Sequence, residues 1–435
     1  MTTNQYEPRP SPFGPLAILG ETTWRSEFRR FGIKEADRLR HLWVLGKTGS
    51  GKSTLLENLI AQDLEAGRGL ALLDPHGDLV RSVAPKVPKQ RFEHTVLFAP
   101  GDTDHPISFN VFRRGRDFHP DHGLLASELV AVFHKHWRDS WGPRLEHILR
   151  NGILAIARDP RASLLFLYRF LTDEKVRTSV ACRIKDPVVA SFWQKEFPSW
   201  KEGLQAEALS PVLNKLGAFV ANQRVRNIVG QERSRIDIGK LMDQRGILLA
   251  DLKVGDIGED ASRLLGSLLL SQIQLAALSR KAPHPPFILY ADEFQYFATD
   301  AIATILSESR KYGLGMVVAH QYLAQLTPNL FQALLGNVGS IAAFRMGAED
   351  AARLASEFFP PFSAKDLEAQ PRFQMAVRLC INGTTSTAFS ARSLAPSPMA
   401  IHPIVALEAL RRASRARFAG RRADIERQIL RFFRT

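Results

Sequence analysis

One stretch near the start of the chain has the residue types and the spacing that bind phosphate. Residues 46–53 read GKTGSGKS, which fits the P-loop pattern G-x-x-x-x-G-K-[ST]; an apolar run, LWVL, precedes them and an apolar helical pattern follows. The glycines of such a loop allow backbone N–H groups to surround phosphate oxygens at the positive end of a helix. We therefore predict nucleotide binding by Gly46, Lys47, Thr48, Gly49, Ser50, Gly51, Lys52, Ser53 and Thr54.

Two side chains of this loop have predicted roles of their own. Lys52 is expected to reach the β- and γ-phosphates of the nucleotide and is a candidate catalytic residue. The hydroxyl group of Ser53 is expected to bind Mg²⁺. The loop thus predicts ATP and Mg²⁺ as cofactors.

A pair of carboxylates follows a second apolar run. In FILYADEF, residues 287–294, Asp292 and Glu293 stand at the end of a predicted strand. Asp292 is expected to bind Mg²⁺, directly or through water, as a Walker-B carboxylate does. Glu293 is expected to polarise the water that attacks the γ-phosphate. An Asp-Glu pair alone more often marks the entry to a helix, but its place after an apolar strand in a chain with a P-loop favours catalysis.

A third candidate group surrounds the apolar run from Met316 to Ala319. Gln321, at the carboxyl end of this predicted strand, is expected to emerge beside the phosphates and to sense or orient the attacking water. Arg310 lies on the predicted helix before the strand, where its guanidinium would reach the nucleotide of a neighbouring subunit as an arginine finger. The alternatives are a strand-end amide that caps backbone groups and a solvated arginine.

The elements that must position these residues alternate between strand and helix. Residues 41–112 and 240–392 contain short apolar strands separated by helices of 10–20 residues, which predicts an α/β domain with a largely parallel sheet. Residues 113–239 have almost no strand signal, and their periodic apolar positions predict an inserted all-α domain. Residues 1–40 are expected to be a lead-in, and residues 393–435 a basic helical tail, either one helix or two helices broken near Gly420.

Composition excludes several classes of protein. The 435 residues are 45% hydrophobic and 23% charged, as in ordinary globular proteins. Cys182 and Cys380 lie far apart, so neither a disulfide framework nor a zinc site is indicated and a reducing, cytosolic setting is expected. We find no secretory signal pattern, and no apolar run approaches the length of about 20 residues that crosses a bilayer.

The positive charge is concentrated in two segments. The net charge is +14; residues 113–240 hold 22 Lys and Arg against 14 Asp and Glu, and residues 411–435 hold nine Arg against two acidic residues. Such a distribution favours contact with a polyanion or a membrane surface, the alternative being a merely solubilising surface. For the tail, the sequence leaves open DNA binding, peripheral contact with the inner membrane and packing between subunits.

Two further loops follow predicted strands. DPHGD, residues 74–78, either shapes the nucleotide pocket or provides a strand exit with helix capping by Asp78. KVGDIGED, residues 253–260, either connects two elements or lines the channel of a ring, where Lys253 would contact DNA phosphates.

Five stretches together resemble the HerA/FtsK superfamily of DNA-pumping ATPases, and within it the conjugative type IV coupling proteins. They are GKTGSGKST, LLDPHGDLV, DLKVGDIGEDASRLLGSLLLSQI, FILYADEFQYF and SESRKYGLGMVVAHQYLAQL, and the match spans most of residues 41–392. The resemblance implies a RecA-like core that forms a hexameric ring around DNA, with nucleotide between subunits. It carries Lys52, Ser53, Asp292, Glu293, Arg310 and Gln321 onto the roles given above, and places Arg345 near an interface.

The resemblance also implies partners. A relaxase and a type IV secretion apparatus are candidates, although the transmembrane segments of membrane-anchored coupling proteins are not evident in the sequence. The leading expectation is an ATP-driven translocase of single- or double-stranded DNA. The alternatives are a secretion or assembly ATPase that moves protein, which would have the same core motifs, and a DNA-binding module that uses nucleotide only as a switch.

Overall fold

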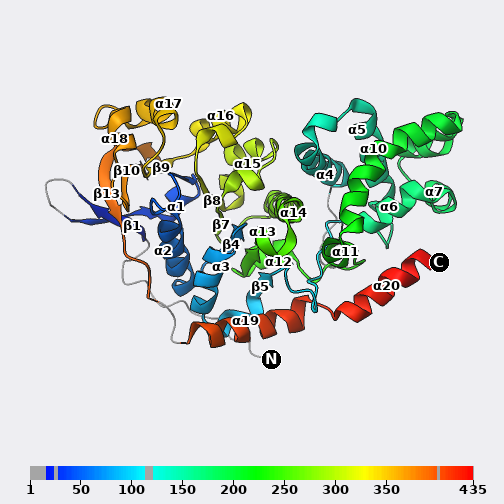
Figure 1. Cartoon of the computed structure of the whole chain (residues 1–435), viewed down its shortest axis with the longest axis horizontal. Coiled ribbons are helices and arrows are strands. Elements are labelled where there is room, and N and C mark those ends of the chain that lie inside the picture. Colours follow the sequence, from blue (N-terminus) through cyan, green and yellow to red (C-terminus); the bar gives the residue numbers. More distant parts are fainter. Residues whose placement is uncertain (1–15, 24–27, 113–120, 399–401, 435) are drawn as a thin grey trace. The chain divides into compact units, whose positions relative to one another are not determined.

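The computed structural model describes residues 16–23, 28–112, 121–398 and 402–434. These residues form two compact units. The sheet unit consists of the described residues within Met1–Phe98, Gly239–Lys253 and Arg280–Ser414, and the helical unit consists of the described residues within Ala99–Ile238, Val254–Ser279 and Arg415–Thr435. Figure 1 shows the elements of both.

A mixed sheet of eleven strands forms the centre of the sheet unit within the described residues. Its order is β2-β1-β13-β10-β9-β3-β8-β7-β4-β6-β5. The strands from β9 to β5 are parallel, and the four at the other side pair antiparallel. The bounds are β1 (Leu16–Thr22), β2 (Arg30–Lys34), β3 (Leu42–Leu45), β4 (Gly69–Asp74), β5 (Thr95–Phe98), β6 (Ile247–Asp251), β7 (Phe287–Ala291), β8 (Leu314–His320), β9 (Ser340–Ala343), β10 (Gln374–Arg378) and β13 (Phe389–Ser393); β11 (Cys380–Ile381) and β12 (Thr384–Thr385) form a separate pair.

The central strands are apolar along their whole length because both of their faces are buried. Every residue of β3, β7 and β8 is buried, including Trp43 and Tyr290, which have no exposed surface. The register aligns the carboxyl ends of β3 and β8, where Leu45 lies opposite His320. The loops that follow these parallel strands therefore emerge at one edge of the sheet.

The N-terminal part of the sheet corrects one expectation. We expected residues 1–40 to be a lead-in, but the described part of this segment contains β1, β2 and α1 (Glu35–Arg38). β1 pairs with β13, more than 360 residues later in the chain. Local patterns do not reveal such a pairing, because a short strand at this side of the sheet gains its partner only on folding.

The helices of the sheet unit cover the strands and connect them. α2 begins with the P-loop lysine and contacts β1 and β4. The sheet unit contains α1, α2 (Lys52–Glu65), α3 (Asp78–Val83), most of α12 (Ile238–Asp243), α15 (Ile302–Glu308), α16 (Pro328–Asn337), α17 (Ala348–Phe358), α18 (Ala364–Glu368) and most of α19 (Pro403–Phe418).

A buried ion pair connects α2 to β7. The guanidinium of Arg38 donates to both carboxylate oxygens of Asp63, at 2.6 and 2.7 Å, and the Tyr290 hydroxyl donates to the same carboxylate at 2.6 Å. Burial by itself would raise the pKa of Asp63, but the charge and hydrogen bonds of Arg38 offset burial and hold that pKa below its ordinary value. The pair fixes the helix that follows the P-loop against the strand that precedes Asp292.

The helical unit packs around aromatic side chains. Phe133 contacts both Trp137 and Phe219, and Phe170 contacts Trp193. Side chains that precede the helices cap them, as Asp121 does by accepting from two N–H groups of α4. The unit contains α4 (His122–His136), α5 (Pro143–Ile156), α6 (Leu164–Thr172), α7 (Glu174–Ala181), α8 (Pro187–Ser191), α9 (Phe197–Ser199), α10 (Glu202–Ala221), α11 (Gln223–Val229), α13 (Val254–Ile257), α14 (Glu259–Leu278) and α20 (Arg422–Arg434). The predicted α/β class with an all-α part is thereby confirmed.

α14 corrects the expectation that no segment is long and apolar enough to cross a membrane. It has 20 residues and passes the test of length and composition, but 89% of its apolar window is buried inside the structure, as in a core helix. Its neighbours within the helical unit include α4.

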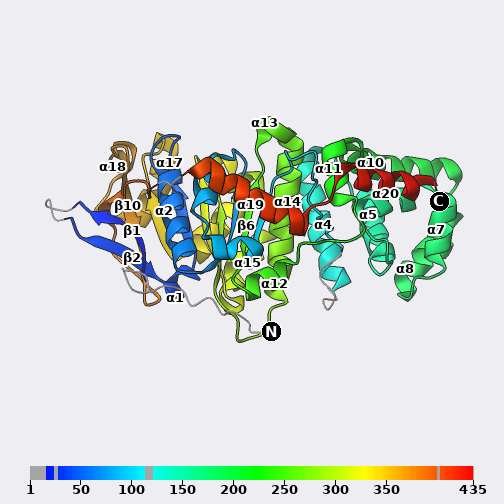
Figure 2. The same ribbon diagram turned by 90° about the horizontal axis from the view of Figure 1, so that it is seen from below.

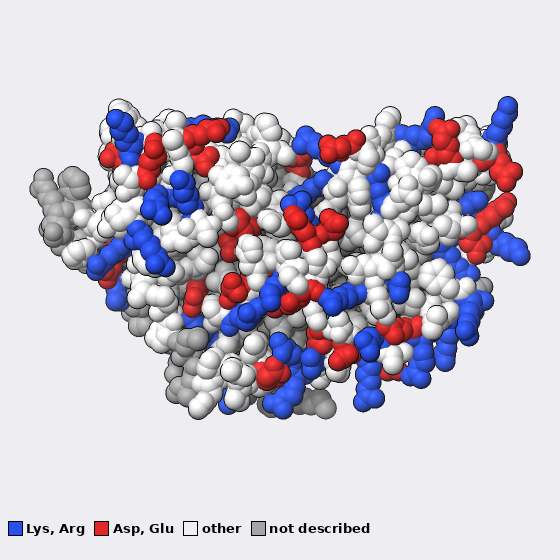
Figure 3. All heavy atoms as spheres, viewed as in Figure 1, with Lys and Arg blue, Asp and Glu red and all other residues white. Residues whose placement is uncertain are grey.

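The tail consists of two helices, which is one of the two arrangements that the sequence predicted. α19 ends at Phe418 and α20 begins at Arg422, so the break includes Gly420. α20 lies beside α11 (Figure 2). Lys and Arg side chains gather along the edge of the surface where Figure 1 places α20 (Figure 3).

Candidate nucleotide-binding and catalytic site

The P-loop leaves β3 and turns into α2 with a backbone that two glycines make possible. Gly46 has φ +152° and Gly51 has φ +126°. A Cβ atom on Gly46 would lie 2.6 Å from the Cβ of Phe344 and 2.7 Å from the Oγ of Ser50, and one on Gly51 would lie 3.0 Å from the Phe344 ring. Lys47, Thr48 and Gly49 form the exposed crest of the loop. Larger residues at the two glycines would close the turn that encircles an anion.

The interior of the loop has the polar groups that a phosphate needs. The Lys52 ammonium donates to the carbonyl of Gly46, and burial lowers its pKa. The hydroxyl group of Ser50 is buried and has no hydrogen-bond partner among the described residues. Ser53 is exposed and Thr54 half-buried in the first turn of α2. A buried unpaired hydroxyl is costly, so a loop that retains one beside an ammonium group fits a phosphate oxygen.

The predicted carboxylates follow β7. Asp292 is buried, and burial, followed by the charges of Asp74 and Glu293, raises its pKa to about 7. The Lys52 charge acts in the opposite direction, so the ammonium and the carboxylate lie in one electrostatic site. A bound divalent cation would supply the positive charge that this carboxylate lacks.

Glu293 has a left-handed backbone, with φ 48° and ψ 53°. Residues other than glycine rarely adopt this conformation, and it costs roughly 1–3 kcal/mol. Both of its carboxylate oxygens accept from amides: Oε1 from Gln321 at 2.7 Å, and Oε2 from Gln295 at 2.6 Å. The side chain of the candidate base is thus held in one place.

Gln321 lies where the sequence places it, at the end of β8, and it bridges two functional segments. Its Nε2 donates to Glu293, and its Oε1 accepts from the Thr48 hydroxyl in the P-loop at 3.1 Å. These partners are side chains, so Gln321 is not the backbone cap that was the alternative. The bridge connects the candidate base to the loop that would surround the phosphates.

His320 is a neighbour of this site that sequence reasoning did not assign. The Trp43 Nε1 donates to its Nδ1 at 3.2 Å across β3 and β8. His320 is fully buried, and burial, followed by the Lys52 charge, lowers its pKa to about 3. It is therefore neutral at physiological pH. The signal in the sequence that could have identified His320 is its place at the end of an apolar strand.

Asp74 is a further carboxylate near Asp292, and it belongs to the DPHGD stretch for which the sequence left two interpretations. It ends β4 and accepts from the backbone N–H groups of His76 and Val80, at 2.9 and 3.0 Å. Val80 lies in the first turn of α3, so Asp74 and not Asp78 caps this helix. Asp74 also adds negative charge beside Asp292, and this favours the interpretation of DPHGD as part of the pocket.

Arg310 does not reach the P-loop of its own chain. It is exposed on a 3₁₀ turn, Ser309–Tyr312, that precedes β8, whereas Gln321 follows the same strand. Seven residues of β8 separate the two ends by about 20 Å. In the part of the chain that the structure describes, the Arg310 guanidinium makes no ion pair, while the adjacent Lys311 pairs with Glu308 at 2.7 Å.

Two other candidates lie near the site, and their roles stay predictions. Lys253 follows β6 and is half-buried, 3.2 Å from the place that a Cβ on Gly77 would occupy. The side chain of Arg345 is exposed, and its backbone carbonyl accepts from the N–H of Lys47 in the P-loop at 2.8 Å.

We predict that Asp292→Asn stabilises the nucleotide-free and magnesium-free protein above neutral pH. Asp292 has a pKa of about 7 in the folded chain and of about 4 when unfolded, so the folded chain retains a proton that the unfolded chain releases. Folding therefore becomes less favourable as the pH rises between these values, by about 1.4 kcal/mol for each pKa unit. Asparagine has no such proton to lose. Melting temperatures measured across this range should diverge as the pH rises; parallel curves would contradict the assignment.

Comparisons with known proteins identify a related family model and similar folds. Residues 33–112 match the family model described as the central domain of the helicase HerA. The bacterial conjugative coupling protein TrwBdeltaN70 is similar in structure, with 16% identity, a TM-score of 0.64, and coverage of 88% of this chain and 90% of that chain. TrwB in complex with ADP and Mg²⁺ gives 17% identity, a TM-score of 0.64, and coverage of 84% and 87%.

A further solved structure has a similar fold. VirB4 of Thermoanaerobacter pseudethanolicus has 15% identity, a TM-score of 0.59, and coverage of 88% of this chain and 97% of that chain. A search of curated protein sequences found no match. The resemblance expected from the motifs is thereby confirmed, and the chain has the fold of HerA/FtsK-type P-loop ATPases, similar to that of conjugative coupling proteins.

Proposed function

We propose that this chain is an ATP-hydrolysing motor that moves DNA in conjugation or mobile-element transfer and works as a ring. The observation that carries the proposal is the bridge from the P-loop through Gln321 to the candidate base Glu293. Similarity to TrwB, which is described as a conjugative coupling protein, supports the transfer role.

In the proposed mechanism each residue has one task. Lys52 binds the β- and γ-phosphates, and Ser53 and Asp292 hold Mg²⁺, which neutralises charge that develops on the phosphates. Glu293, held by two amides, accepts a proton from the attacking water. TrwB has been described with ADP and Mg²⁺, which supports these cofactors.

The position of Arg310 supports action between subunits. The guanidinium is exposed and lies at the end of β8 opposite to its own P-loop, so it is available to another copy of the chain. A head-to-tail contact that repeats by rotation closes into a ring. We therefore propose a homo-oligomeric ring, with a hexamer as the expected size, in which each Arg310 neutralises transition-state charge in the neighbouring site.

DNA as the track is supported by charge. The chain carries a net charge of +14, and its surplus lies mainly in residues 113–240 and in the tail. A relaxase and a type IV secretion apparatus are the proposed partners, because they would supply and receive a transferred strand. The proposed DNA contact of Lys253 lies on a loop beside the nucleotide site.

The first prediction from the proposed function concerns the bridge. Gln321→Glu should lower kcat for ATP hydrolysis by about 100-fold, because a carboxylate cannot donate to Glu293 and repels it, while ATP affinity should stay within about twofold. Steady-state kinetics and nucleotide binding measure the two effects. The matched control is Gln332→Glu, an exposed glutamine on α16. Equal activity of the two variants would contradict the proposed bridge.

The second prediction concerns the track. DNA should raise the ATPase rate of the wild-type chain, and the increase should fall steeply with salt because phosphate contacts release counterions. Glu293→Gln should bind ATP without turning it over and is the control for contaminating activity. Single- and double-stranded DNA are tested in parallel. An ATPase rate that responds to neither would exclude the DNA motor and favour the alternative of a motor that moves protein.

The third prediction concerns the shared site. Arg310→Ala should abolish hydrolysis while retaining ATP binding, whereas Lys311→Ala, which removes the neighbouring cation, should retain activity. Mixing Arg310→Ala with Glu293→Gln should restore activity, because about one interface in four then combines an intact base with an intact arginine. Hydrolysis by the mixture is compared with each variant alone. Absence of any recovery, with mixed oligomers verified by mass, would rule out the arginine finger.

A further inference from the structure

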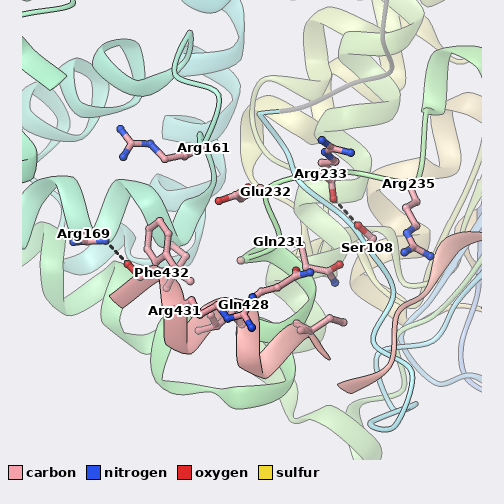
Figure 4. A pocket seen from close by; sticks show the side chains of 14 residues that line it. Ser108, Arg161, Arg169, Gln231, Glu232, Arg233, Arg235, Gln428, Arg431 and Phe432 are labelled. Atoms are coloured by element: carbon pink, nitrogen blue, oxygen red, sulfur yellow. Dashed lines mark hydrogen bonds between the residues drawn. The ribbon is translucent and has the colours of Figure 1, made fainter. Parts of the chain in front are cut away.

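A hollow of about 620 Å³ lies in the helical unit beneath α20. Its walls come from the helical unit alone (Figure 4). Sites for nucleotide-sized ligands typically measure about 300–1,000 Å³. A second hollow of about 530 Å³ continues along the same helix and shares Arg235, Gln428 and Arg431 with the first. None of its lining residues belongs to the candidate nucleotide site described above.

Positive charge dominates the lining. The charged residues of the hollow are Arg161, Arg169, Glu232, Arg233, Arg235 and Arg431. The arginines come from three segments: two from the α6 side, two from the segment that follows α11, and one from α20, so they surround the hollow on several sides (Figure 4). Glu232 is the one carboxylate of this lining, and ion pairs with Asp159 and Asp173 outside it partly offset the charges of Arg161 and Arg169. The lining still has more positive than negative charge, and this favours an anionic ligand.

Several of these guanidinium groups are already oriented. Arg161 forms two hydrogen bonds with Asp159, both at 3.0 Å, and Arg169 donates to the backbone carbonyl of Phe432 in α20. Arg235 donates to the carbonyl of Ala419 at 2.6 Å, and this neutral acceptor does not offset the charge of the guanidinium. Guanidinium groups held in this way lose little freedom when they bind a further acceptor, and their planar N–H arrays match phosphate oxygens.

The shape of the site favours a compact anion over a nucleic-acid strand. Its apolar lining, Leu165, Ile425, Ile429 and Phe432, belongs to the packing of α20. The Phe432 ring is occupied, because it contacts the ring of Phe166 and lies under the Arg169 guanidinium. Binding of single strands uses aromatic rings that are free to stack on bases, and the lining offers none.

We propose that this hollow binds a multiply charged phosphate compound of about nucleotide size, and that the bound compound fastens α20 to the helical unit. The ligand would join Arg431 on α20 to the arginines of the opposite walls. Phe432 already holds the far end of α20. An anion between Arg431 and the arginines of the opposite walls would therefore slow local opening of the helix. The site is independent of the proposed ATPase function.

The experiment uses the full chain with Lys52→Ala, which weakens phosphate binding at the P-loop, and inorganic tripolyphosphate as the probe. Calorimetry should detect one site, and Arg233→Gln or Gln428→Glu should weaken it at least fivefold. Both residues line the hollow and are exposed, so the substitutions should not impair folding. Tripolyphosphate should also slow hydrogen exchange of the α20 amides. A nucleoside triphosphate and inorganic phosphate, tested separately, distinguish the possible sources of the phosphate.

The matched control is Arg144→Gln, which removes an exposed arginine of α5 that pairs with an exposed glutamate, Glu207. It should leave both binding and exchange unchanged. Binding that is absent at millimolar tripolyphosphate, or that all three variants weaken equally, would overturn the proposal. So would binding of a DNA oligonucleotide that depends on Arg233 and Gln428 when tripolyphosphate does not bind, since the hollow would then be a nucleic-acid contact.

Discussion

A buried ion pair sets the relative position of the two halves of the nucleotide site. Asp63, near the end of α2, binds Arg38 and the Tyr290 hydroxyl without contact with water. α2 begins with Lys52, and Tyr290 precedes Asp292 by two residues, so one carboxylate determines where the P-loop helix lies against the strand of the acidic pair. Removing one partner of a buried pair typically costs about 3–5 kcal/mol, and here it would also separate the groups that hold the phosphates from those that act on the water.

Three features of the site cost conformational or electrostatic free energy. Glu293 has a left-handed backbone, Asp292 has a raised pKa, and the Ser50 hydroxyl has no partner among the described residues. Each is unfavourable in the ligand-free chain, and a cation with a phosphate would relieve the last two. The buried strands and the Asp63 ion pair stabilise the fold. This stabilisation allows the groups at the edge of the sheet to keep a conformation that suits a cation and a phosphate.

The sequence predicted the residues whose signal is local. The P-loop, the Asp292–Glu293 pair and Gln321 each follow an apolar run, and parallel strands bring such ends to one edge. The contacts between them were not predictable, because the order β3-β8-β7-β4 is not the order of the chain. Asp74 and the Trp43–His320 hydrogen bond depend on that order. The strand β1 was missed for the same reason, since its partner β13 lies near the other end of the chain.

On the proposed arrangement, β8 would couple neighbouring sites. One end carries Gln321, which contacts the base and the P-loop, and the other end follows Arg310, which would enter the next copy's site. The strand between them is buried, hydrogen-bonded on both sides, and held at His320 by Trp43. A displacement of Gln321 on hydrolysis would therefore be transmitted along a stiff element and not absorbed by a loop. Such a strand gives sequential firing around a ring a physical basis, because the state of one site would set the position of the arginine in the next.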